Sequence, residues 1–287
     1  MVTTRSQDKN RPSETEEDHE PRAGEKRPHS KAAQAKTDEP VAKQREGGHP
    51  HSRRESRAHD VDKQQKKASG TTETPENSKI AQLISKYGDL PLSDTALSDP
   101  DKATPDTVLA LLLNALLSST RISHALAAKT IAALIQAGYH KLDVLEKSTW
   151  EERTEVLTEG GYTRYREKTA TMMGDLTELI KHKYGGDVNA IPGLAGKDPH
   201  KIRSELKNVK GLGDVGVDIF FDTVQHVWPC VAPFLDPRSL KTAEEIGIGG
   251  DVHALWKAVS EDSGQMCRLA AALTKVRLDG KESEFTG

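Results

Sequence analysis

The fold of this chain is decided by the stretch LKNVKGLGDVGV, residues 206–217, which predicts a helix, a tight turn and a second helix. Just upstream, Asp198 and Pro199 supply an N-cap and a first-turn proline for the first of these helices. Gly211 and Gly213 interrupt the helical pattern, and we expect both to turn the chain at positive φ, where glycine alone is unstrained. Apolar residues at helical spacing resume directly after the turn.

The glycine turn suggests an anion-binding site. Bare N–H groups at such a turn, together with the positive end of the following helix, can point at an anion, and a DNA phosphate is the obvious candidate. A Gly-x-Gly between two helices also serves as a plain connection, and short motifs of this kind occur in many unrelated proteins. On the turn alone, both interpretations stay open.

The first part of the chain differs sharply in composition from the rest. Residues 1–79 contain no Leu, Ile, Phe, Tyr, Trp or Cys, whereas residues 80–287 have a globular composition. A segment without large apolar residues cannot bury enough surface to offset its ordering entropy, so we predict a disordered tail followed by one folded domain. Short basic pairs in the tail fit either a weak nuclear address or a solvated segment: Lys26-Arg27, Arg53-Arg54 and Lys66-Lys67.

The overall composition excludes several classes of protein. The formal net charge is −3, so the chain is not a strongly basic nucleic-acid binder, and any DNA-binding surface must be a local patch. Its two cysteines, Cys230 and Cys267, are too few for a disulfide scaffold or a four-cysteine iron–sulfur site, and we expect no metal or other cofactor. No apolar run reaches the roughly 18 residues of a membrane span. We therefore expect a soluble, intracellular monomer with no membrane partner.

Every strongly periodic segment beyond residue 79 is helical, which predicts an all-α fold. Residues 108–117 are apolar almost all round, which is typical of a central, buried helix. Capping signals mark further helix starts, including Thr104 before Pro105 and a capping box of Thr149 with Glu152. Besides the two helices around the turn, the expected helices cover residues 80–87, 105–117, 126–137, 142–145, 150–159, 164–184, 239–246, 252–259 and 264–276.

Taken in order, these segments resemble the endonuclease III-like DNA glycosylases, the HhH-GPD superfamily. Residues 209–217 resemble that family's Leu-Pro-Gly-Val-Gly-Arg-Lys-Thr-Ala turn, and residues 228–232 resemble its Trp-Pro-Thr-Ile-Ala segment. Residues 234–241 resemble the Val-Asp-Thr-His or Leu-Asp-Gly-Asn stretch that carries the family's catalytic aspartate. Upstream, residues 112–120 and 161–170 resemble its leucine-rich helix and its Gly-Leu-Tyr-Asn-x-Lys-Ala segment.

The resemblance implies a two-lobed DNA glycosylase of base excision repair, which binds double-stranded DNA and flips a damaged or mispaired base into the cleft between its lobes. Asp236 would be the catalytic carboxylate, stabilising positive charge at C1′ and assisting the attacking water. Asp218 is the fallback for this role, followed by Asp222. The implied DNA contacts form three groups: the turn residues Lys210, Gly211, Leu212, Gly213, Val215 and Gly216; the loop residues Ser119, Thr120 and Arg121; and the cations Lys168 and Arg238, with Arg164, Arg166 and Lys207 as further candidates. A nuclear location fits this role.

The chain departs from the family inside the turn. Bifunctional members form a Schiff base through a lysine at the position of Val215, so we expect a monofunctional enzyme without that lyase step. Asp214 stands where the family has a basic residue, and we expect it to cap the following helix. Asp236 has a second interpretation as the N-cap of a helix that starts at Pro237, and both roles can hold together.

Two other functions stay open. The chain can be a catalytically inactive helix-hairpin-helix protein that binds DNA or a repair partner, an alternative favoured by Val215, Asp214 and the net negative charge. It can also be a helical interaction domain with no role on DNA. Binding by such a domain would not weaken as salt rises, whereas phosphate contacts are salt-sensitive.

Overall fold

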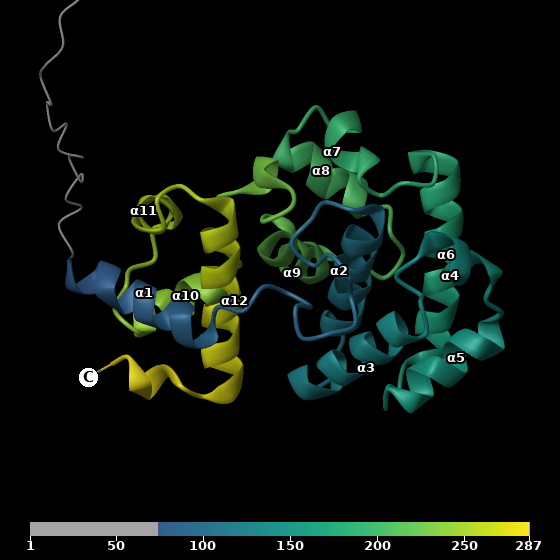
Figure 1. Cartoon of the computed structure of the whole chain (residues 1–287), viewed down its shortest axis with the longest axis horizontal. Helices are drawn as coiled ribbons and strands as arrows, with labels where there is room; N and C mark the ends of the chain where they lie inside the picture. Colours follow the sequence, from purple (N-terminus) through teal and green to yellow (C-terminus); the bar gives the residue numbers. More distant parts are fainter. Residues whose placement is uncertain (1–73, 287) are drawn as a thin grey trace, which may run out of the picture. The chain divides into compact units, whose positions relative to one another are not determined.

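The computed structural model describes residues 74–286, a range that is all-helical and contains no strand (Figure 1). The all-α prediction is therefore confirmed. None of the helices in this range is long and apolar enough to cross a membrane. In chain order the elements are α1 (Pro75–Tyr87), α2 (Pro105–Ser118), α3 (His124–Gln136), α4 (Leu142–Lys147), α5 (Trp150–Glu159), α6 (Arg166–Tyr184), α7 (Ala190–Leu194), α8 (Pro199–Leu206), α9 (Asp214–Val224), the 3₁₀ helix η1 (Pro229–Val231), α10 (Pro237–Glu245), α11 (Val252–Ala258), α12 (Ser263–Asp279) and η2 (Glu282–Glu284).

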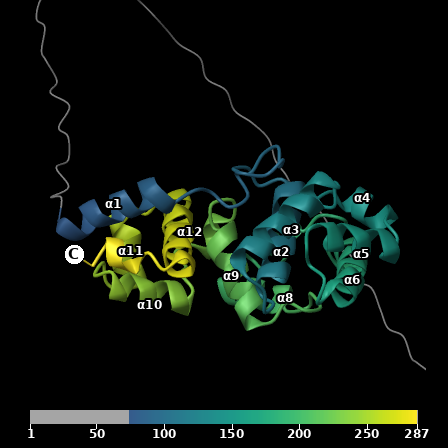
Figure 2. The same cartoon turned by 90° about the horizontal axis from the view of Figure 1, so that it is seen from below.

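The helices form two groups, each around its own hydrophobic cluster (Figures 1 and 2). The larger group contains α2 to α9. The smaller group contains α1 together with α10, α11 and α12, so the first and last helices of the domain lie side by side. This arrangement matches the expected two-lobed helical bundle.

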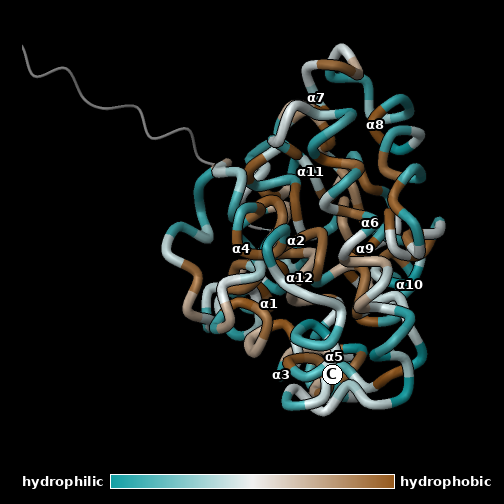
Figure 3. The backbone as a smooth tube through the Cα atoms, turned by 90° about the vertical axis from the view of Figure 1, so that its right-hand side faces the viewer, coloured by the Kyte–Doolittle hydropathy of each residue, from teal (hydrophilic) through white to brown (hydrophobic). Residues whose placement is uncertain are grey.

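α2 lies at the centre of the larger group. Leu111 and Leu112 are fully buried, and the hydrophobic colouring of this helix is visible in Figure 3. Burying one such side chain contributes about 1.5–3 kcal/mol, which explains why a helix that is apolar all round takes the central position.

Several predicted helix ends are confirmed by their capping contacts. The Thr104 hydroxyl accepts the amide of Thr107 at 3.0 Å. Thr149 and Glu152 form the reciprocal capping box, with hydrogen bonds of 3.1 and 2.7 Å. α6 ends at Gly185, whose φ of 63° lies in the left-handed region.

Some boundaries differ from the prediction. α1 begins at Pro75 rather than Ile80, because Thr74 caps it and proline fits its first turn. The predicted tail of residues 1–79 is therefore too long, and its residues 1–73 lie outside the described range. α6 begins at Arg166 rather than Arg164, and α7, a short helix that contains Pro and Gly, was not predicted.

α9 connects the two groups. It packs against α2 in the larger group and against α12 in the smaller one. Its buried Phe220 and Val224 belong to the larger cluster. The helix is therefore held from both sides, and whatever its two ends carry is fixed relative to both groups.

Candidate functional site

The predicted helix–turn–helix is present as α8, a turn and α9. Gly211 has a φ of 88°, as expected, and a Cβ there would collide with Sδ of Met172 in α6. The expectation for Gly213 is wrong: its φ is −81°, an ordinary value for any residue. A Cβ at Gly213 would meet open space, so neither strain nor packing within residues 74–286 requires glycine at this position.

The turn presents backbone amides, but not all those expected. The Leu212 amide donates to the carbonyl of Val209 at 3.1 Å and its side chain is buried, so it does not face an anion. The amide of Val217 begins the helical bonding by donating to Gly213. The amides in between, those of residues 213–216, have no hydrogen-bond partner within the described chain. The group able to bind an anion is therefore the first turn of α9, where residues 213–215 are exposed.

Asp214 does not cap α9. The N-cap is Gly213, and Asp214 is the first residue of the helix, where its carboxylate forms an ion pair with Lys207. Hydrogen bonding and charge from Lys207 lower the pKa of Asp214 below its ordinary value. The predicted capping role is wrong because the side chain finds a cation across the turn. Lys207 is consequently engaged and does not stand free as a phosphate contact.

Lys210 lies on the opposite side of the turn and pairs with Asp175 of α6 at 3.2 Å. Lys168 lies one helical turn before Met172, the residue that contacts Gly211, so it is on the face of α6 nearest the turn. Lys168 is exposed and makes no ion pair with any described residue. Of the two predicted DNA contacts Lys168 and Lys210, only Lys168 has no carboxylate partner among the described residues.

The loop between α2 and α3 lies against the first turn of α9. A Cβ at Gly216 would approach the Ser119 Cβ at 3.3 Å and the Leu212 Cδ1 at 2.7 Å, so glycine permits this close packing. The hydroxyl of Thr120 accepts a 3.1 Å hydrogen bond from Tyr162. Arg121 is exposed and makes no ion pair within residues 74–286. The structure thus brings together two sets of residues predicted separately from the sequence.

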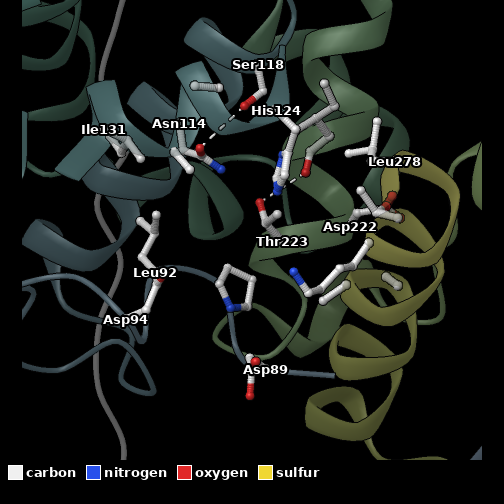
Figure 4. Close-up of a pocket in the computed structure, with 18 of the residues that line it drawn as sticks. Asp89, Leu92, Asp94, Asn114, Ser118, His124, Ile131, Asp222, Thr223 and Leu278 are labelled. Carbon is white, nitrogen blue, oxygen red and sulfur yellow. Dashed lines mark hydrogen bonds between the residues drawn. The ribbon is translucent and has the colours of Figure 1, made fainter. Parts of the chain in front are cut away.

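A cavity of about 480 Å³ continues from this loop (Figure 4). Asn114 and Ser118 of α2 line one side and are joined by a 3.4 Å hydrogen bond. Asp222 of α9 and Leu278 of α12 line another side. Thr120 is also in the lining, so the cavity and the loop are continuous. Its size falls within the range of small-molecule sites.

Asp236 lines the cavity and caps α10. Its Oδ1 accepts the amides of Arg238 at 2.6 Å and Ser239 at 3.0 Å, which confirms the N-cap interpretation. Arg238 Nη2 donates to Oδ2 at 3.1 Å, and its Nε donates to Oδ1 at 3.3 Å. Burial acts to raise the pKa of Asp236, but the guanidinium and the amides outweigh it, so the pKa lies below its ordinary value. Asp236 is therefore an anion at neutral pH, and Arg238 is bound to it rather than free for a phosphate.

The fallback Asp218 is not at the cavity. It pairs with Arg203 at 2.6 Å, and that guanidinium lies over the rings of Phe221 and Phe234. Asp222, one helical turn later, faces the cavity instead. The sequence signal for this position is a carboxylate that directly follows the apolar residues Ile219, Phe220 and Phe221 on the helix after the turn.

α9 fixes the segment that carries Asp236. Asp222 Oδ1 accepts the Asp236 amide at 3.0 Å. Three residues later, Gln225 donates to the Phe234 carbonyl at 3.0 Å and accepts the Phe234 amide at 3.2 Å. α9 therefore presents unpaired amides at its N-terminus and, through residues near its C-terminus, positions the segment that carries Asp236.

No cluster of three or more metal-ligating side chains occurs within residues 74–286. Cys230 and Cys267 are free thiols, and Cys267 is a core residue whose Sγ lies 3.4 Å from Nδ1 of His226. The expectation that no iron–sulfur cluster or other cofactor is bound stays a prediction. A scan against protein-family models and a search of curated proteins each found no match to this chain.

Proposed function

We propose that this chain is a monofunctional DNA N-glycosylase of the endonuclease III-like type, acting on double-stranded DNA in base excision repair. One observation carries the proposal. An ionised carboxylate, Asp236, lies in the wall of a cavity of nucleobase-accommodating size and is tied by α9 to an exposed set of unpaired amides. The expectations that the protein is a cofactor-free monomer and lies in the nucleus belong to the same proposal.

The first turn of α9 supports phosphate binding. Three exposed amides at a helix N-terminus favour an anion, and the Asp214 charge that would oppose it is neutralised by Lys207. Arg121 and Lys168 supply positive charge that no described carboxylate compensates. With a rise of about 1.5 Å per residue, nine residues of α9 set the amides and Asp222 roughly 13 Å apart.

The cavity supports extrusion of one base. Flipping costs a few kcal/mol and least for a damaged or mispaired base, which favours lesions over intact pairs. The side-chain amide of Asn114 and the hydroxyl of Ser118 offer donors and acceptors to the edge of a base. Leu92 and Ile131 supply apolar surface for its faces.

Asp236 supports the chemistry. The bond between C1′ and the base nitrogen breaks and its electron pair leaves with the base, so positive charge develops on the sugar. A fixed carboxylate in a partly desolvated cavity stabilises that charge. Water then bonds to C1′, and the proton that it loses neutralises the departing base. Arg238 is half-exposed, so the approaching sugar can displace its Nη2 from Oδ2.

An excision panel tests the proposal. Purified protein is incubated with duplexes that carry uracil, an oxidised pyrimidine, an alkylated purine or a mismatch, and base release is followed. Asp236→Asn should lower the rate on the active substrate about 10²–10³-fold. Asp218→Asn, on the same helix as Asp222 but outside the cavity, should leave it within about twofold, since Asp218 only pairs with Arg203. Release from none of these duplexes by the wild-type protein would reject the glycosylase assignment.

A catalytically inactive DNA-binding or partner-binding protein is the second candidate. The observation in its favour is that Asp236 is only 2% exposed and is covered by Arg238. Tight duplex binding that weakens as salt rises, without base release, would select this candidate. Binding of a protein partner without salt dependence would instead select an interaction domain with no DNA role.

A further inference from the structure

Two buried carboxyl groups meet in the wall of the cavity. Asp222 is 6% exposed and Asp236 is 2% exposed. They come from different elements, α9 and the start of α10, and are joined by the 3.0 Å hydrogen bond from the Asp236 amide to Asp222 Oδ1. Burial acts to raise the pKa of both carboxyls, whereas hydrogen bonding between their side chains raises the pKa of Asp222 further and lowers that of Asp236. Two carboxylates cannot form that last contact while both are ionised, because neither then has a proton to donate.

Two guanidinium groups lie near this pair, and among the described residues only that of Arg238 forms an ion pair with it. Arg238 binds Asp236 through two nitrogens, whereas toward Asp222 it forms no ion pair and its charge only opposes the rise in that carboxyl's pKa. Arg277 of α12 lies in the same cavity, but within the described residues its buried Nε has no partner and it forms no ion pair with either carboxylate. Burial and the neighbouring Asp236 raise the pKa of Asp222 well above its ordinary value. The remaining titratable groups that face the pair or line the cavity are Tyr87 of α1, Asp89 and Asp94 of the following loop, His124 of α3, and Cys267 and Lys275 of α12.

We propose that Asp222 is a positioning residue that works as a neutral carboxylic acid: one oxygen fixes the main chain of Asp236, and the other carries a proton that it donates to the Asp236 carboxylate. The pair then holds one proton and one negative charge. Its consequence for base excision rests on the proposed function, whereas the protonation of Asp222 does not.

A neutral Asp222 explains how the Asp236 carboxylate can be buried and still be held in one orientation. A second anion at this distance would repel Asp236 and leave an uncompensated buried charge. Protonated Asp222 instead donates a hydrogen bond to the Asp236 carboxylate and accepts one from the Asp236 amide. Together with Gln225, which binds both polar groups of the Phe234 main chain, Asp222 holds the segment 234–236 against α9.

Asp222→Asn is the decisive variant, because asparagine has the shape and the hydrogen-bonding pattern of the protonated acid. In the wild-type protein, a carboxyl whose pKa is raised by folding costs stability as the pH rises above the ordinary aspartate range. Asparagine does not ionise, so it removes that cost. We expect equal melting temperatures near pH 4, and a melting temperature of Asp222→Asn at least about 2 °C above wild type at pH 8.

The opposite result overturns the proposal. If Asp222 is ionised in the folded protein, Asp222→Asn melts below wild type at pH 8, and the gap closes on acidification. A pH-independent difference between the two proteins overturns it equally. Asp218→Asn is the control, since Asp218 is an aspartate of the same helix whose ion pair with Arg203 is intact. Because melting reports on folding directly, a variant that folds poorly is recognised as such.

Excision kinetics then test the positioning role on the substrate that the panel identifies. Asp222→Asn should stay within about threefold of wild type, whereas Asp222→Ala should fall about 10²-fold in kcat because Asp236 loses its orientation. Ionisation of Asp222 at alkaline pH should lower the wild-type rate, and this decline should be absent from Asp222→Asn. Equal losses for Asn and Ala overturn the positioning role. If wild-type protein excises no base, the proposed function fails, and the melting comparison still decides the protonation of Asp222.

Discussion

Arg238 holds Asp236 with two guanidinium nitrogens, at 3.1 Å from Oδ2 and 3.3 Å from Oδ1. The two residues are only two positions apart, so the first turn of α10 supplies both the amides and the guanidinium that keep its own N-cap ionised. This arrangement makes the cavity carboxylate a permanent anion near neutral pH.

Removing the Arg238 guanidinium should make ionisation of Asp236 less favourable in the folded protein. In Arg238→Ala, burial is opposed by fewer groups, so the pKa of Asp236 rises toward or above its ordinary value. The ionised form of Asp236 stabilises the wild-type fold above the ordinary aspartate range and loses this effect as the pH falls through its lowered pKa. We expect Arg238→Ala to lose about 1–2 kcal/mol at pH 7, with the difference shrinking below pH ~4, as measured by urea unfolding. Lys241→Ala, which removes an exposed α10 pair with Glu245, should cost less than about 0.5 kcal/mol. Equal losses of unfolding free energy for Arg238→Ala and Lys241→Ala at pH 7 would contradict this account.

The two glycines of the turn should separate stability from binding. Gly211→Ala forces an alanine to a φ of 88° and against Met172, so it should cost about 1–3 kcal/mol in thermal unfolding. Gly213→Ala has a permitted φ and open space, so it should change stability by less than about 0.5 kcal/mol.

Gly213→Ala should nevertheless weaken duplex binding in fluorescence anisotropy, because its methyl group stands beside the exposed amides of α9. If binding by Gly213→Ala equals that of wild type, the phosphate does not approach this turn.

The uncompensated cations should account for the salt dependence of DNA binding. Arg121→Gln and Lys168→Gln should each weaken duplex binding uniformly across sequences and lower the slope of log K against log salt by about 1. Lys257→Gln, an exposed lysine on α11 of the other group, is the matched control and should change neither quantity. Identical slopes for all three variants would place the DNA elsewhere on the surface.

A lysine at position 215 should add chemistry that the natural chain lacks. Val215 is 50% exposed on the first turn of α9, so a longer side chain fits there. Val215→Lys should form a borohydride-trapped covalent adduct with duplex DNA that contains an abasic site, since its amine can form a Schiff base with the sugar aldehyde. Val215→Arg has the same charge and cannot react, so it should form none. Absence of an adduct from Val215→Lys, with abasic duplex still bound, would show that this position does not face the sugar.

The sequence was sufficient to predict features that depend only on residues a few positions apart, such as helix caps and helix ends. The Thr149–Glu152 box, the end of α6 at Tyr184 and the cap at Asp236 depend on contacts within three or four residues, and each was predicted correctly. The burial of α2 also follows directly, because a helix that is apolar all round has no polar face to expose.

Tertiary structure decided which of the predicted groups work together. Asp218 and Asp222 are equivalent by spacing, but Arg203, 15 residues before Asp218, takes one, while the Asp236 amide, 14 residues after Asp222, takes the other. The capping role predicted for Asp214 was wrong for the same reason, since its carboxylate pairs with Lys207 across the turn. Local propensity depends on neighbours along the chain, whereas the partner of a charged or buried polar side chain depends on which elements the packing of two hydrophobic clusters brings together.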